Sequence, residues 1–307
     1  MTATTGPAAP SQPAGAPPPV AGAARRSLVT RMTRIVSGGV AQVVLIAVAL
    51  MWLVPSFGLM VASLRPEADN TASGWWNALT HPGQLTVDNY RALFDNSTMT
   101  DSFLNTVYIT VPTTVLVVVV AALAAYAFAW MDFPGRDWWF LLVVGLLVVP
   151  LQVGLIPVAK LYGSLGLFGS ITGVVLYHVA FGLPFAIFLL RNFFAGIPRD
   201  LLEAARMDGA TELRIFLRVI MPLGLPAIAS LAIFQFLWVW NDLLIALIFA
   251  GPGSRPLTVA IQEQTRQFGN NIDVISSAAF LSMLVPLMVF FAFQRFFVQG
   301  VLAGSVK

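Results

Sequence analysis

The sequence contains no cysteine and little charge: 17 Lys or Arg and 14 Asp or Glu residues make up 10% of its 307 positions. The lack of cysteine excludes disulfide bonds, thiolate nucleophiles and cysteine metal sites. Soluble domains usually carry about 25% charged residues, whereas this chain is 58% hydrophobic, with 23 Phe and 8 Trp. Because a soluble exterior needs charge, the composition excludes an ordinary soluble globular protein as well as a disordered chain.

Six long stretches between charged residues contain no charge, and each is at least 21 residues long. About 20 apolar residues are enough for a helix to cross the hydrocarbon of a bilayer. Backbone polar groups in lipid must be bonded within their own segment, so we expect an all-α membrane protein with six transmembrane helices. The expected spans are residues 38–62, 104–130, 138–159, 170–190, 224–249 and 277–297.

The basic residues predict the orientation of these spans. Most of the 17 Lys and Arg residues lie in the segments that share a side with the two termini, which places both termini and the 191–222 loop in the cytoplasm. The pI near 9.6 therefore reflects topology, and no motif indicates a nucleic-acid partner. Residues 1–34 are expected to form a disordered cytoplasmic tail rich in Ala and Pro, and residues 35–307 a six-helix transmembrane domain.

The 191–222 loop has its own helical pattern. Asp200 is a candidate N-cap, and Glu203 follows it at the spacing of a capping box. The pair Asp208-Gly209 predicts the end of this short helix, because glycine readily takes the left-handed conformation of a C-cap.

A second amphipathic stretch follows in the same loop. Leu213, Phe216, Leu217 and Ile220 are expected on one face, opposite basic residues. The loop could dock on a partner surface or lie on the lipid surface, and the pattern alone leaves both open.

Asp242 is the one acid inside an expected span, and intramembrane charges are candidates for functional sites. With Trp240 and Asn241 it could line a polar translocation path, although a hydrogen bond between helices is an equally simple role. His81 and His178 are far apart in the sequence, and no metal site is expected.

The loop also carries a specific motif. Glu203-Ala204-Ala205 is followed by Asp208-Gly209-Ala210, then Phe216, and this order resembles the EAA loop of bacterial ABC importer permeases. Other segments are similar to permeases of binding-protein-dependent carbohydrate importers: Ser63-Leu64-Arg65-Pro66, Asn89-Tyr90, Asn105-Thr106, Phe236 to Asp242 and Arg255-Pro256-Leu257. The sequence from Gln294 to Lys307 resembles the tail of the smaller maltose permease subunit.

The resemblance implies a permease domain whose 191–222 coupling loop docks on a cytoplasmic ATPase dimer. It assigns ATPase coupling to Glu203, Ala204, Ala205, Asp208, Gly209 and Ala210, and a possible ATPase contact to Gln299, Gly300 and Lys307 in the tail. It further implies a second permease subunit and an extracytoplasmic solute-binding protein, all working in a bacterial inner membrane. Neither Lys160 nor Lys307 follows the glycine pattern of a phosphate-binding loop, so ATP is expected on the partner and no cofactor in this chain.

The expected function is therefore ATP-driven import of a sugar or oligosaccharide, with no enzymatic activity in this chain. Two alternatives remain: a secondary transporter driven by an ion gradient, and an ABC importer for glycerol phosphate or a polyol.

Overall fold

The computed structural model describes residues 28–268 and 272–303, which are helical with no β-strand among them. The longer α-helices are α1 (Leu28–Ser63), α4 (Ser97–Trp130), α5 (Arg136–Leu146), α6 (Leu155–Leu165), α7 (Ile171–Ala195), α10 (Met221–Trp240), α12 (Leu257–Phe268) and α13 (Ile272–Ala303). The shorter ones are α2 (Glu67–Ala72), α3 (Asp88–Asp95), α8 (Arg199–Met207), α9 (Glu212–Ile215) and α11 (Leu244–Phe249). Three 3₁₀ turns, η1 (Trp75–Leu79), η2 (Pro82–Gln84) and η3 (Leu151–Gly154), and one π-helical turn, η4 (Phe216–Ile220), complete the described chain.

The chain divides into two units, residues 1–54 and 55–307. The described part of the first unit is the N-terminal portion of α1, which begins at Leu28. The predicted tail lies outside the described residues as far as residue 27. All of the sites discussed below belong to the second unit.

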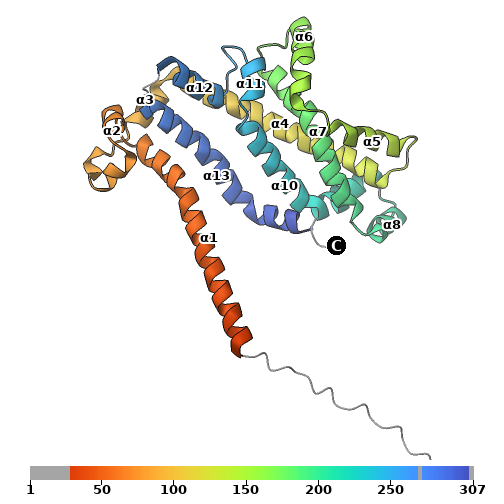
Figure 1. Ribbon diagram of the computed structural model, residues 1–307. Coiled ribbons are helices and arrows are strands. Elements are labelled where there is room, and N and C mark those ends of the chain that lie inside the picture. Colours follow the sequence, from red (N-terminus) through yellow and green to blue (C-terminus); the bar gives the residue numbers. More distant parts are fainter. Residues whose placement is uncertain (1–27, 269–271, 304–307) are drawn as a thin grey trace, which may run out of the picture. The chain divides into compact units, whose positions relative to one another are not determined.

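The described helices have the lengths of five membrane crossings, or six if one bent pair of helices forms a single span. Within the described residues, five helical stretches are long and apolar enough to span: Gly39–Ser63, Ser97–Trp130, Ile171–Ala195, Glu212–Trp240 and Ile272–Arg295. A sixth crossing is possible through α5 and α6 together, which meet at a bend of 94° (Figure 1). The all-α membrane fold predicted from the gaps between charges is confirmed.

Two predicted spans are not single continuous helices. The predicted span 138–159 is broken, and Pro150 stands at the start of η3 with an extended ψ of 132°. Proline has no amide hydrogen and cannot continue a helical ladder. The predicted span 224–249 ends as a helix at Trp240, and α11 begins separately at Leu244.

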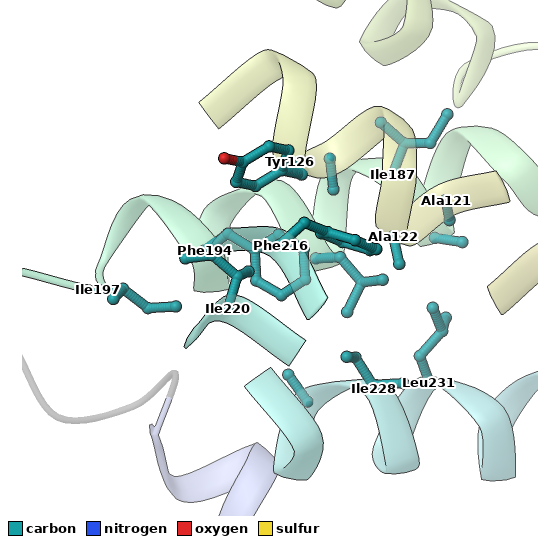
Figure 2. Packing of buried hydrophobic residues seen from close by; sticks show 14 of the residues in the cluster. Ala121, Ala122, Tyr126, Ile187, Phe194, Ile197, Phe216, Ile220, Ile228 and Leu231 are labelled. Atoms are coloured by element: carbon teal, nitrogen blue, oxygen red, sulfur yellow. The ribbon is translucent and has the colours of Figure 1, made fainter. Parts of the chain in front are cut away.

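Small residues allow the central helices to approach closely. Helix α4 packs along α7, and α10 contacts both of them. Ala121, Ala122 and Ala125 of α4 are fully or almost fully buried there, within the cluster that Figure 2 shows. A methyl group on Gly224 of α10 would stand 2.6 Å from Phe194. Small residues at helix contacts are typical of membrane bundles, because dispersion forces rather than water expulsion hold the helices together.

A buried arginine organises the loop after the first span. Arg65 has no exposed surface, and its guanidinium donates to Gln84 Oε1 at 3.2 Å, Ser73 Oγ at 2.8 Å and the Asp69 carbonyl at 2.9 Å. Asn89 donates to the Arg65 carbonyl at 2.8 Å. The motif residues Arg65 and Asn89, far apart in sequence, therefore form one folded element.

A second pair of motif residues holds the segment after α11. Asn105 donates to the carbonyls of Gly253 and Arg255 at 3.2 and 3.1 Å. Thr106 accepts from the Leu257 amide at 2.8 Å, and its hydroxyl is therefore used structurally. These contacts connect α4 to the start of α12.

Candidate functional site

Helix α8 ends in the turn that the sequence predicts. Gly209 has a φ of 74°, the left-handed conformation. Its amide donates to the Arg206 carbonyl at 3.0 Å, and the Ala210 amide donates to the Ala205 carbonyl at 3.0 Å. These two bonds form a Schellman motif, which fixes the direction in which the chain leaves the helix.

The start of α8 differs from the prediction. The helix begins at Arg199, Pro198 occupies the N-cap position, and no side chain caps it. Glu203 pairs instead with Arg199, one turn earlier, with 2.8 Å between Arg199 Nε and Glu203 Oε1. Proline suits this helix start because its missing amide hydrogen would have had no partner there. The predicted capping box of Asp200 and Glu203 is therefore wrong.

The two sides of α8 have opposite surroundings. Leu202 is completely buried in the core, and Ala205 packs against the same core. Glu203 and Ala204 are exposed, and Met207 is 89% exposed. A short helix that buries one side and exposes an apolar methionine on the other offers a surface for a partner.

A polar network that sequence reasoning missed fixes the segment after the Gly209 turn. Glu212, the first residue of α9, accepts a short hydrogen bond from the hydroxyl of Tyr126 in α4. Arg206 Nε lies 3.0 Å from Glu212 Oε1, and Arg206 Nη2 donates to the Trp130 carbonyl at 3.3 Å. The bond to Glu212 is the main cause that raises the pKa of Arg206 above its ordinary value. Trp130 in turn donates to the Phe194 carbonyl at 3.1 Å.

The next stretch buries a different set of residues from the predicted one. Phe216 and Ile220 are buried as expected, and so is Ile215, but Leu213 and Leu217 are 62% and 53% exposed. Residues 216–220 form a π-helical turn, which is wider than an α-helical one and shifts the face that a helix presents. Tyr126 and Phe216 lie next to each other, with their ring centroids 5.3 Å apart (Figure 2).

The three residues predicted to line a path lie in three different environments. Trp240 is 2% exposed, and its indole donates to the Ser282 carbonyl of α13 at 2.9 Å. Asn241 is exposed and lines a cavity beside α12 and α13. The carboxylate of Asp242 accepts from the amides of Ile245 at 3.3 Å and Ala246 at 3.0 Å, at the start of α11.

His178 lies close to Asp242. Its Nε2 is 3.5 Å from Asp242 Oδ2, and the histidine is 1% exposed. Both residues border a cavity of about 10 Å³ with Thr106 and Thr110, room for about one water molecule. No group of three His, Asp or Glu residues that could hold a metal ion occurs in the described part of the chain.

A larger cavity, which the sequence did not predict, lies between α7 and α10. This aromatic cavity measures about 260 Å³ and is lined by Phe181, Gly182, Phe185, Leu231, Phe234, Gln235 and Trp238. Gln235 is 4% exposed, and its Nε2 has no hydrogen-bond partner among the described residues. A methyl group on Gly182 would stand 2.9 Å from that nitrogen, so glycine makes room for the amide.

The arrangement of this cavity suits an uncharged solute. Aromatic walls with a few well-placed polar groups are typical of small-molecule sites. The signal available in the sequence was Gln235 itself, a large polar residue inside an apolar span.

The tail residues add little to the site. Gln299 and Gly300 fall within α13, whose side chains are not described there, and Lys307 lies outside the described residues. Their predicted contact with an ATPase stays a prediction.

Comparison with known proteins identifies the family. Residues 98–303 match the family described as "Binding-protein-dependent transport system inner membrane component". The chain is 50% identical over 271 residues to the osmoprotective compounds uptake permease protein GgtD of Synechocystis sp., covering 87% of this chain and 91% of that protein. It is 48% identical over 255 residues to the alpha-glucoside transport system permease protein AglG of Rhizobium meliloti, covering 81% and 67%.

A solved structure has the same fold. A chain of a bacterial ABC transporter involved in the import of the acidic polysaccharide alginate superimposes with a TM-score of 0.73 at 24% identity, covering 86% of this chain and 98% of that one. The curated relatives are permeases, which are transport proteins and not enzymes. The chain therefore belongs to the family of inner membrane components of binding-protein-dependent transport systems.

Proposed function

We propose that this chain is one of two permease subunits in an ATP-driven importer for a sugar or oligosaccharide. An ATPase dimer on the cytoplasmic side binds the ATP, and an extracytoplasmic solute-binding protein delivers the solute. Both termini and the 191–222 loop face the cytoplasm, in agreement with the distribution of Lys and Arg.

The observation that carries this proposal is that α8 is held against the core on one side only. Leu202 is buried in the core, and the bonds among Tyr126, Glu212 and Arg206 fix the segment beyond the turn. The side with Glu203 and Ala204 stays exposed. A helix held on one side and free on the other can transmit the movement of a docked ATPase to the spans. Ala204 permits close approach, and Glu203 can accept charge-assisted hydrogen bonds.

Two observations favour a sugar as the solute. The relative AglG is named for alpha-glucosides, which are sugars. The aromatic cavity has no charged residue in its lining and pairs aromatic rings with the amide of Gln235. Glycerol phosphate would require a positive group at such a site, so the lining favours a neutral solute.

The alternative of a secondary transporter finds less support. It would need acid or basic groups that bind the coupling ion inside the spans. Asp242, beside His178, is the one acid inside the predicted spans, and its carboxylate already accepts two amides at the start of α11. Those bonds give Asp242 a structural role.

Uptake measured in proteoliposomes separates the two mechanisms. The chain is reconstituted with its ATPase, second permease and binding protein, and labelled maltose or trehalose is supplied outside. Uptake should require ATP inside the liposomes and survive an uncoupler. Uptake that persists without ATP and collapses with the uncoupler would overturn the proposal in favour of a secondary transporter.

A further inference from the structure

A second cavity lies beyond the C-terminal end of α10, where α10, α12 and α13 meet. This cavity, here called the Asn241 cavity, measures about 440 Å³. It is lined by Asn241, Leu243, Thr258, Ile261, Gln262, Ala279, Ser282, Met283 and Pro286. The volume is sufficient for one or two sugar rings, since small-molecule sites span about 300–1,000 Å³.

The lining chemistry restricts what can bind there. None of the lining residues carries a charge. Asn241 and Gln262 contribute amides, and Thr258 and Ser282 contribute hydroxyls. Asn241 Nδ2 already donates to the Leu237 carbonyl at 2.8 Å and the Thr258 hydroxyl to the Asp242 carbonyl at 2.6 Å, so the oxygens of these two side chains remain as acceptors. Leu243, Met283 and Pro286 supply apolar surface. Amides and hydroxyls beside apolar walls match a molecule with many hydroxyl groups and no charge, and they give a phosphate nothing to neutralise it.

Gln262 points to a ligand directly. Its Oε1 is buried and accepts no hydrogen bond from the described residues. Buried acceptors are nearly always satisfied, and a donor that enters the cavity, either a water molecule or a ligand hydroxyl that displaces it, can satisfy this one. The free atom is an acceptor, and a sugar hydroxyl is a donor that matches it.

The Asn241 cavity follows the aromatic cavity along α10. Phe234 and Trp238 line the aromatic cavity, and Asn241 lines the second one. These three residues follow the i, i+4, i+7 spacing of one helix face. Asn241 is the C-cap residue of α10, so the two cavities are lined by residues about one helical turn apart.

We propose that the Asn241 cavity is a second contact site for the solute, and that it binds an uncharged polyhydroxyl molecule through a hydroxyl donated to Gln262 Oε1. This inference rests on the proposed function, because it takes the solute to be a sugar. The solute passes between the Asn241 cavity and the aromatic cavity during transport.

The first test compares two glutamines of the same helix. Gln262→Leu removes the acceptor, whereas Gln264→Leu makes the same change at a position that does not line the cavity. The complete transporter is reconstituted, and labelled maltose and trehalose serve as probes. Gln262→Leu should lower the sugar imported per ATP hydrolysed about fivefold, the effect of one lost hydrogen bond. Gln264→Leu should match the wild type.

The outcomes separate this inference from the proposed function. If the wild type imports neither sugar, the proposed function fails and the inference falls with it. If the wild type imports sugar and Gln262→Leu performs as well as Gln264→Leu, the second site is refuted while the importer stands. A loss of ATPase activity in Gln262→Leu alone would also count against the site, because it would indicate a structural role for Gln262.

The second test uses the absence of cysteine from the chain. Ser282→Cys places a single thiol in the cavity, and Met288→Cys places one on the exposed surface of the same helix. A charged methanethiosulfonate reagent is applied to the transporter with cysteine-free partner subunits. The thiol at position 282 should react, and saturating maltose or trehalose, whichever is imported, should slow it at least threefold. A thiol at position 282 that does not react, or that reacts equally fast with sugar present, contradicts the proposal.

Discussion

The hydroxyl of Tyr126 donates a hydrogen bond to Glu212, 86 residues further along the chain. Tyr126 lies near the C-terminal end of α4, and Glu212 begins the segment that follows the Gly209 turn. The contact joins a membrane span directly to the 191–222 loop. Helix α8 therefore has a polar connection to α4, through Arg206 and Glu212, in addition to its contact with the apolar core.

Replacing Tyr126 tests this connection. Tyr126→Phe removes the hydroxyl but keeps the ring that packs against Phe216. The lost bond to a partly exposed carboxylate should cost about 1 kcal/mol. We expect ATP hydrolysis to continue while the sugar imported per ATP falls. Tyr108→Phe is the control, since Tyr108 lies on the same helix with an exposed side chain. Equal transport by the two variants would remove Tyr126 from the coupling route.

The turn at Gly209 makes a second prediction. Gly209→Ala forces a side chain into the left-handed region, at a cost of roughly 1–2 kcal/mol. The turn should open in part of the molecules, and binding to the ATPase should weaken measurably in a pull-down at graded ATPase concentrations. Gly163→Ala, in α6 with open space around it, should bind the ATPase normally. Unchanged binding by Gly209→Ala would mean that the turn does not set the direction of α8.

The aromatic cavity makes a third prediction. A methyl group at position 182 would stand 2.9 Å from Gln235 Nε2, so Gly182→Ala should push the amide into the cavity. We expect slower sugar uptake with normal assembly and normal binding of the ATPase. Gly145→Ala, where nothing lies within 4 Å, should leave uptake unchanged. Uptake at the wild-type rate in Gly182→Ala would exclude the aromatic cavity from the solute path.

Properties that depend on residues adjacent in the sequence could be predicted from it. The spans follow from the long gaps between charges, because a charge in lipid is costly wherever the helix packs. The stop at Gly209 follows from local backbone preference and is confirmed by its φ of 74°.

The bends within the spans could be predicted only in part. Hydropathy is the same on both sides of Pro150 and of residues 241–243, so it predicts a crossing and cannot tell a straight helix from a broken one. Pro150 itself favours a break at the first position, because proline cannot continue a helical ladder. Residues 241–243 contain no proline or glycine, and the end of α10 there is visible only in the structure.

Contacts between distant segments could not be predicted. The sequence gives no sign that Glu212 and Tyr126 are in contact, because the two residues are 86 positions apart and belong to different helices. Gly182 is required beside Gln235 only because α7 and α10 pack side by side, and that packing is visible only in the structure. At Trp240 the sequence suggests a role that the structure does not support. Its indole was predicted to line a translocation path, but it donates to the Ser282 carbonyl of α13 instead.

The most direct test of the central claim is the rate of ATP-driven sugar uptake by Glu203→Lys in the reconstituted transporter. Glu203 is exposed on α8, so the change should leave the fold intact while it reverses the charge offered to the ATPase. We predict that uptake and ATPase association are both lost, whereas Glu67→Lys, an exposed acid on α2, retains them. Normal uptake and normal ATPase association in Glu203→Lys would contradict the assignment of α8 as the coupling helix.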